Sequence, residues 1–141
     1  VYILGDGSEK SALQRYISEN KMGKKVTMLG YQLNPYKYIA RCDLFVCGSY
    51  AEGFSTAATE ALILGTPVCT VEVSGMREML GDENQYGIIV NNNEQELYLA
   101  IRHLITNREL LSYYKEMAIE RGTFFNTEKT VQAVEKMLLA L

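Results

Sequence analysis

The sequence lacks the residues and runs that several classes of protein require. It has one histidine, His103, and its three cysteines (Cys42, Cys47 and Cys69) form no CxxC pair, which argues against a zinc site and indicates reduced core cysteines in a cytosolic protein. No apolar run approaches the ~20 residues of a membrane-spanning helix. No basic run exceeds two residues and the formal net charge is −3, so we expect no nucleic-acid partner.

The remaining composition is that of an ordinary globular chain. Of 141 residues, 48% are hydrophobic and 22% are charged, and this length suits one domain because a compact core typically takes ~100–200 residues. We therefore expect residues 1–141 to form a single domain. The chain opens on Val1 and not on an initiator methionine, and it shows no basic signal-peptide segment, so we expect it to be an N-terminally truncated part of a longer cytoplasmic protein.

Short apolar runs alternate with helical patterns along the chain. The runs predict five strands, at residues 1–4, 26–29, 44–47, 68–71 and 87–90. Helices are predicted from a Ser8 cap to near Gly23, over 36–41, over 56–64 after a Ser55 cap, from an Asn93 cap, over a segment that Gly122 ends, and from Asn126 or Thr127. Near-continuous apolar strands separated by helices indicate an α/β fold, with a Rossmann-like doubly wound parallel sheet and flanking helices.

One loop combines a glycine with the start of a predicted helix. It runs Gly48-Ser49-Tyr50-Ala51-Glu52-Gly53-Phe54-Ser55, directly after the third predicted strand. Gly53 would let the backbone approach a ligand, and the amides that follow would point out of the helix start. Unpaired amides and about +0.5 charge at a helix N-terminus favour a phosphate group.

Two carboxylates accompany this helix start. Glu60 is the only charged residue between Glu52 and Glu72, in a helix so apolar that we expect it to be buried all round. Its carboxylate would then bond a vicinal diol such as that of a ribose, or would lie in a solvated groove or pair with a distant arginine. Glu52 is either a surface loop acid or a group that orients sugar hydroxyls beyond the phosphates.

These residues resemble the GT-B glycosyltransferases of family 4. The similarity lies in Glu52-Gly53-Phe54-Ser55, in Glu60-Ala61-Leu62, which completes an E-x7-E spacing, and in Gly65-Thr66-Pro67-Val68. Further landmarks follow the family order: Gly5-Asp6-Gly7, Leu29-Gly30, 42–46, Ser74-Gly75 with Glu78, and 86–90. The resemblance implies the C-terminal, donor-binding domain of a retaining enzyme.

The resemblance also implies a role for each matching residue. Glu52 would be the catalytic glutamate that contacts the transferred sugar, and Glu60 would hold the ribose hydroxyls. The other donor-binding residues would be Ser49 in the loop, Gly53, Phe54, Ser55 and Thr56 at the diphosphate, Gly30 and Tyr31 beside the base, and Gly5 and Gly7 on the cleft floor. Tyr31, Tyr36 and Tyr38 would flank the base pocket, although we expect at least two of them to serve in edge packing instead.

The implied reaction moves a hexose from a nucleotide diphosphate sugar, with UDP the expected carrier, to a glycan or lipid-linked acceptor. It needs no metal and no cofactor, because helix-end charge would stabilise the departing diphosphate. The acceptor-binding N-terminal domain and a basic pair that clamps the diphosphate would lie upstream, so the fragment alone should be inactive. Any membrane contact, peripheral at the inner membrane, would involve that absent domain. Lys10 and Arg77 would be solvated or would partly replace the basic pair.

Three other functions were weighed against this one. A dinucleotide-dependent oxidoreductase would need a small residue where Lys10 completes the pattern Gly5-x-Gly7-x-x-Lys10, and an acid soon after the second strand, so it is disfavoured. A nucleotide-sugar epimerase of GT-B type and a non-catalytic nucleotide-binding module stay open as alternatives. An epimerase needs no acceptor, so product analysis separates it from a transferase.

Overall fold

The computed structural model describes residues 1–125, 128, 131, 132 and 136. Its contacts divide the chain into two compact units, Val1–Pro35 and Tyr36–Leu141, and each is described by itself. The single-domain organisation therefore stays a prediction, and most of the helix predicted from Asn126 or Thr127 lies outside the described residues. Within the described part of the chain, no helix combines the length and the apolar character needed to cross a bilayer.

The first unit is a β-α-β segment. Strand β1 (Tyr2–Leu4) pairs in parallel with β2 (Thr27–Gly30), and α1 (Lys10–Glu19) connects them. The predicted Ser8 cap is wrong, because the N-cap of α1 is Glu9 and no side chain caps the helix. Ser8 lies one residue too early, and its hydroxyl donates instead to the Glu9 carboxylate at 3.5 Å.

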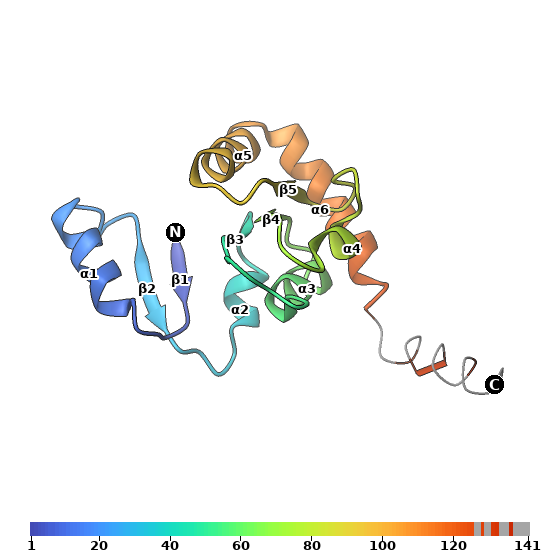
Figure 1. Ribbon diagram of the computed structural model, residues 1–141, viewed down its shortest axis with the longest axis horizontal. Coiled ribbons are helices and arrows are strands. Elements are labelled where there is room, and N and C mark those ends of the chain that lie inside the picture. The colour runs from blue at the N-terminus through green and yellow to red at the C-terminus, as the bar shows by residue number, and fades with distance from the viewer. Residues whose placement is uncertain (126–127, 129–130, 133–135, 137–141) are drawn as a thin grey trace. The chain divides into compact units, whose positions relative to one another are not determined.

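The second unit carries the remaining elements (Figure 1). In chain order they are α2 (Tyr36–Ile39), β3 (Phe45–Cys47), α3 (Thr56–Ile63), β4 (Val68–Val71), α4 (Met76–Leu80), β5 (Ile88–Val90), α5 (Glu94–Thr106) and α6 (Arg108–Gly122). Its three strands are parallel in the order β3-β4-β5, with Phe45 opposite Val68 and Cys69 opposite Ile88. All five predicted strands are present, but they form two parallel sheets, of two and three strands, where the sequence analysis predicted one.

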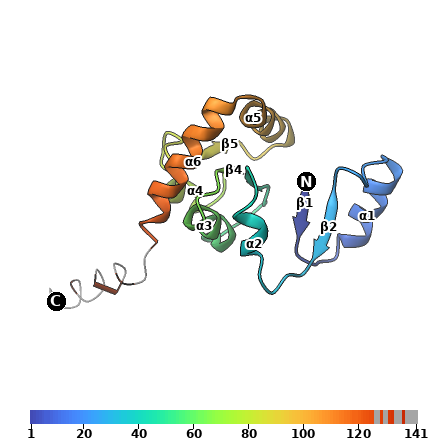
Figure 2. The same ribbon diagram turned by 180° about the vertical axis from the view of Figure 1, so that it is seen from behind.

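The central strand of the second unit supplies both halves of the core. All four residues of β4 are buried. Val68 and Val71 pack with apolar side chains of α3 and α4, whereas Cys69 packs with Leu104 of α5 and Tyr114 of α6. Helices therefore cover both faces of the sheet (Figure 2), as the near-continuous apolar strands predict. Burial raises the pKa of the Cys69 thiol to about 12, so this core cysteine stays a neutral thiol.

Side-chain caps position the helices that follow the sheet. Asn93 accepts a hydrogen bond from the Glu96 amide at 2.8 Å and donates its own amide to the Glu96 carboxylate at 3.0 Å, which confirms the predicted cap of α5. The side chain of Asn91, then that of Asn93, donate to this carboxylate and lower the pKa of Glu96. The helix start is therefore held by reciprocal hydrogen bonds directly after β5.

Helices α3 and α6 lie in close contact near their C-terminal ends. Gly65, at φ +70°, has no room for a methyl group because a Cβ would lie 2.8 Å from Cγ1 of Ile119. At Gly122 a Cβ would overlap the carbonyl oxygen of Leu62 and would lie 3.0 Å from Cα of Ile63. The backbone of α6 thus rests directly on the last turn of α3.

We expect Gly122→Ala to destabilise the protein. Alanine normally improves a helix by about 1 kcal/mol over glycine. Here the methyl group meets the backbone of α3, so we expect the free energy of unfolding to fall by about 1–3 kcal/mol. Urea denaturation, monitored by circular dichroism, measures this free energy of unfolding. Gly23→Ala, where a Cβ has nothing within 4 Å, is the control and should change stability by less than about 0.5 kcal/mol. A gain in stability for Gly122→Ala would contradict the close approach.

Candidate functional site

Three loops of the second unit meet at one edge of its sheet. Because β3, β4 and β5 are parallel, the segments 48–55, 72–75 and 91–93 all leave from the carboxyl ends of the strands. The side-chain amide of Asn92 donates to the carbonyl oxygen of Ser49 at 3.3 Å. A Cβ on Gly75, at φ +80°, would lie 2.6 Å from the carbonyl oxygen of Gly53, so only glycine lets these two loops approach so closely.

Helix α3 begins at this edge. Ser55 is its N-cap, as predicted, and the Ser55 hydroxyl accepts from the Ala58 amide at 3.4 Å. Ser55 is buried, while the next residue, Thr56, is exposed. The first amides of a helix have no intrahelical acceptor, so the start of α3 presents donors toward an anion. A Cβ on Gly53 would meet nothing within 4 Å, so the backbone just before the helix has open space beside it.

Glu52 is half-buried and has a short hydrogen bond to its own loop. The Ser49 hydroxyl donates to Oε1 of Glu52 at 2.6 Å, and Sγ of Cys47 lies 3.4 Å from the same hydroxyl oxygen. The structure therefore brings together the predicted catalytic glutamate and the predicted donor-binding serine. Glu52 has a fixed partner, which a freely solvated loop acid would lack.

Glu60 lies on α3, but the prediction that this helix is buried all round is wrong. Ala58, Ala61 and Leu62 are buried, Ile63 is 53% exposed, and Glu60 is half-buried. Its Oε1 accepts a hydrogen bond from the Tyr36 hydroxyl at 3.3 Å. Small residues make the helix apolar by composition, although one side of it faces solvent. The partner of Glu60 is thus a tyrosine of α2, where the alternatives from the sequence were an arginine, a solvated groove or a ligand diol.

The Tyr36–Glu60 contact changes the acidity of the phenol. The negative charge of Glu60, followed by the hydrogen bond to it, raises the pKa of Tyr36 above its ordinary value. The phenol therefore keeps its proton and remains a donor to the carboxylate at neutral pH.

Four further predicted donor-binding residues, Gly5, Gly7, Gly30 and Tyr31, belong to the first unit. Gly5 and Gly30 have positive φ angles of +115° and +65°, and the Gly5 amide donates to the carbonyl oxygen of Gly30 at 2.9 Å. Gly7 and Gly5 line a hollow of about 210 Å³ within this unit. Tyr31 follows β2 and is exposed. Their roles at a cleft floor and beside a base stay predictions.

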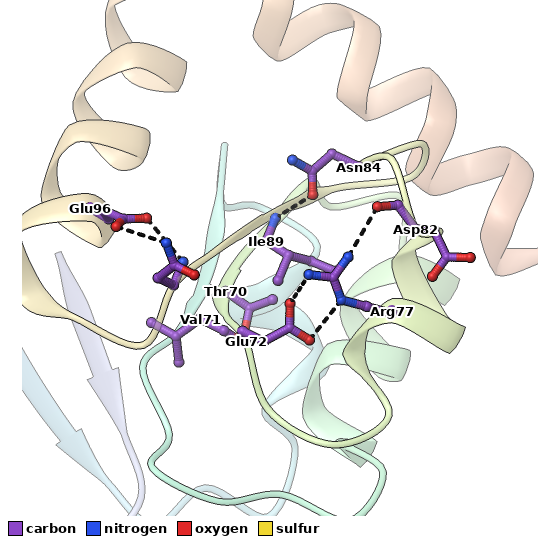
Figure 3. Close-up of polar contacts among 9 residues, drawn as sticks. Thr70, Val71, Glu72, Arg77, Asp82, Asn84, Ile89 and Glu96 are labelled. Atoms are coloured by element: carbon purple, nitrogen blue, oxygen red, sulfur yellow. Dashed lines mark hydrogen bonds and ion pairs between the residues drawn. The ribbon is translucent and has the colours of Figure 1, made fainter.

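Both cations that the sequence offered as phosphate ligands have acidic partners. Lys10 Nζ lies 3.0 Å from Oδ2 of Asp6, and that hydrogen bond, followed by one from the Gly7 amide, lowers the pKa of Asp6. Arg77 donates through Nε to Glu72 at 3.0 Å and through Nη1 to the carbonyl oxygen of Asp82 at 3.3 Å (Figure 3). Arg77 thus stabilises the segment around α4 by bonding to residues before and after the helix.

Three contributors to this site were not found from the sequence. The sequence predicts Tyr36 only as a neighbour of the base and Gly75 only as a landmark of the resemblance, and it gives no signal for Asn92. Each acts on a residue more than 20 positions away, so no local pattern reports it. Helix α4 was also missed, because its five residues are too few for a helical period.

The chain is similar in sequence to known glycosyltransferases. Residues 1–121 match the family model described as glycosyl transferases group 1. Over 139 residues the chain is 36% identical to an enzyme of Campylobacter jejuni, N-acetylgalactosamine-N,N'-diacetylbacillosaminyl-diphospho-undecaprenol 4-alpha-N-acetylgalactosaminyltransferase. It is 26% identical over 138 residues to poly(ribitol-phosphate) alpha-N-acetylglucosaminyltransferase of Staphylococcus aureus. These matches cover 97% of this chain in both cases, and 38% and 28% of the two enzymes, so the chain spans well under half of either relative.

Solved structures share the fold. A variant of Staphylococcus aureus TarM, in complex with fondaparinux, alpha-GlcNAc-glycerol and UDP, has a TM-score of 0.83 and 25% identity, over 97% of this chain and 28% of TarM. Anabaena HepE, in complex with UDP, has a TM-score of 0.87 and 23% identity, over 99% of this chain and 40% of HepE. These neighbours are GT-B glycosyltransferases. The α/β fold with parallel sheets and flanking helices is thereby confirmed.

We expect the pKa of Tyr36 to lie above the ordinary value of a tyrosine. Phenolate formation would place a second negative charge beside Glu60, so removing that charge in Glu60→Gln should lower the pKa of Tyr36 toward its ordinary value. NMR of tyrosine labelled with carbon-13 at the ring, with Tyr36→Phe to assign the signal, follows the titration between about pH 8 and 12. Equal pKa values for Tyr36 with and without Glu60 would contradict the contact.

Proposed function

The chain belongs to the family of glycosyl transferases group 1, and from this premise we propose that it is the donor-binding part of a glycosyltransferase. The enzyme moves a hexose, here including the N-acetylhexosamines, from a UDP-sugar to a glycan or lipid-linked acceptor. It belongs to family 4 and retains the anomeric configuration of the sugar. The observation that carries the proposal is the pair of half-buried carboxylates, Glu52 and Glu60, on either side of the start of α3.

The start of α3 suits a diphosphate. The amides around Phe54 to Ala57 carry the partial positive charge of the helix end, and open space beside Gly53 leaves room for an anion. This charge stabilises the departing diphosphate without a metal ion or a cofactor. Basic residues of the full-length protein, outside this chain, complete the clamp, since Lys10 and Arg77 are neutralised by their own acidic partners.

The two carboxylates suit the two sugars of the donor. Glu60, on the first turns of α3, accepts hydrogen bonds from the ribose hydroxyls. Glu52 lies in the loop before the helix, and we expect it to contact the transferred sugar, which follows the diphosphate. For Gly5, Gly7, Gly30 and Tyr31, which belong to the first unit, a role beside the base or on the cleft floor rests on the family resemblance alone.

The names of two relatives support an N-acetylhexosamine as the transferred sugar. The names of the Campylobacter and Staphylococcus enzymes both specify alpha-linked N-acetylhexosamine products, and the TarM variant was solved with UDP. An α-linked UDP-sugar that yields an α-linked product retains its configuration. We place this enzyme in polysaccharide or glycolipid assembly in the cytoplasm, peripheral at the inner membrane. A separate domain of the same protein binds the acceptor, and the 141 residues alone do not complete a transfer.

We expect Glu60→Ala to weaken nucleotide binding. Loss of charge-assisted hydrogen bonds to the ribose should lower the binding free energy of UDP by about 1–3 kcal/mol, or about 5-fold to 150-fold in Kd. Ligand-observed NMR with UDP, GDP, ADP and NAD measures this on the full-length protein. Glu116→Ala, an exposed acid of α6, is the matched control and should leave Kd unchanged. Binding of NAD alone, or a Kd for UDP that is the same in the wild type and in Glu60→Ala, would show the donor-site assignment to be wrong.

Glu52→Gln should abolish most transfer while sparing nucleotide binding. The substitution keeps the shape of the side chain and removes its charge, so we expect kcat to fall about 10²-fold to 10³-fold, with Kd for UDP nearly constant. Release of UDP from UDP-N-acetylglucosamine, UDP-N-acetylgalactosamine and UDP-glucose measures the rate, and proton NMR of the product reports its anomeric configuration. A β-linked product would exclude retention, and an isomerised nucleotide sugar formed without acceptor would indicate an epimerase.

A further inference from the structure

The hydroxyl of Ser49 lies between two partners, and it has one proton to donate. Oγ of Ser49 is 2.6 Å from Oε1 of Glu52 and 3.4 Å from Sγ of Cys47. An ionised carboxylate only accepts hydrogen bonds, so the Ser49 proton lies on the Glu52 side. Cys47 then donates its thiol proton to Oγ. The three side chains form a directed chain, from the Cys47 thiol through the Ser49 hydroxyl to the Glu52 carboxylate.

The distances rank these contacts. The 2.6 Å separation is in the range of a charge-assisted O–H···O⁻ bond, whereas the thiol contact is long and thiols are weak donors. The bond to Glu52 is therefore the strong one, and Cys47 adds a minor polarising contact. Only one of the two carboxylate oxygens is occupied by Ser49.

The backbone of Ser49 is held by a hydrogen bond from the loop between β5 and α5. Asn92, between β5 and α5, donates its side-chain amide to the carbonyl oxygen of Ser49 at 3.3 Å. The next residue, Asn93, caps α5, so Asn92 sits on a segment that is itself held by hydrogen bonds. Ser49 is thus supported by β3, which it follows, and by the start of α5.

We propose that Ser49 is a positioning residue for Glu52. It holds Oε1, fixes the rotation of the carboxylate and directs Oε2 toward the transferred sugar, while Asn92 supports the loop. This inference rests on the proposed function, in which Glu52 contacts that sugar. It also revises the donor-binding role that the resemblance suggested for Ser49, because the only hydroxyl proton is already donated to Glu52 and is not available to the diphosphate.

The test compares four variants of the full-length protein: Ser49→Ala, Ser49→Thr, Glu52→Gln and the double variant Ser49→Ala/Glu52→Gln. Each is assayed for UDP release from whichever of UDP-N-acetylglucosamine, UDP-N-acetylgalactosamine and UDP-glucose the wild type uses, and for Kd of UDP. Ser112→Ala, an exposed serine on α6, is the control for loss of a hydroxyl. Assays are run well below the melting temperature of each variant, so that a less stable protein still yields a kcat.

A positioning role predicts a split between rate and affinity. Ser49→Ala should lower kcat about 10-fold to 100-fold, because a misdirected catalytic group costs up to about 10²-fold, while KM for the donor and Kd for UDP change less than about twofold. Ser49→Thr keeps the hydroxyl and should recover most of the rate. In the Glu52→Gln background, Ser49→Ala should cost less than about twofold more, since Ser49 acts through the Glu52 carboxylate.

Contrary results separate this inference from the proposed function. A wild type that releases UDP from none of the three donors overturns the proposed function itself. An active wild type overturns only the positioning role if Ser49→Ala retains full kcat, if it weakens UDP binding at constant kcat, or if its loss of rate is undiminished in the Glu52→Gln background.

Discussion

The parallel pairing of three short strands is the constraint on which the site depends. β3, β4 and β5 contribute only three, four and three residues, yet their common direction brings three loops to one edge. The contacts across that edge are specific. Asn92 reaches Ser49, and Gly75 leaves room for Gly53. Loss of the parallel register would therefore separate the loop that carries Glu52 from the segments that support it, even if every helix kept its shape.

The positive charge that this edge offers to an anion comes mainly from backbone amides at the start of α3. Arg77, the nearest cation in the chain after β4, is already engaged by Glu72 and by the carbonyl oxygen of Asp82. These contacts of Arg77 hold the segment around α4. The start of α3 keeps its partial positive charge, because its serine cap satisfies the Ala58 amide and leaves the earlier amides directed outward. An anion whose negative charge is spread over several oxygens would therefore bind the amides at the start of α3 in preference to Arg77, which already pairs with Glu72.

Much of the fold could be predicted from the sequence, since its signals are local. Apolar runs located all five strands, and Ser55 and Asn93 identified two caps because a short side chain three residues before a helical amide accepts from it. The failures have physical causes as well. Ser8 satisfies the cap pattern but lies one residue before Glu9, the N-cap of α1, and the composition of α3 suggested complete burial although its apolar residues are mostly small. The pairing of Tyr36 with Glu60 had no local signal, because 24 residues separate them.

The two glutamates of the site differ in how their partners are held. Ser49 is three residues from Glu52, on the same loop, and its bond is short. Tyr36 reaches Glu60 from another helix, at 3.3 Å, through a side chain that is 46% exposed. A local, short bond costs little entropy to maintain, so Glu52 keeps one orientation. A longer bond from an exposed phenol is readily exchanged for another hydroxyl, and a ribose hydroxyl offers the same chemistry at the same oxygen. The geometry therefore suits Glu52 to a fixed position beside a reacting sugar, and Glu60 to reversible binding of a diol.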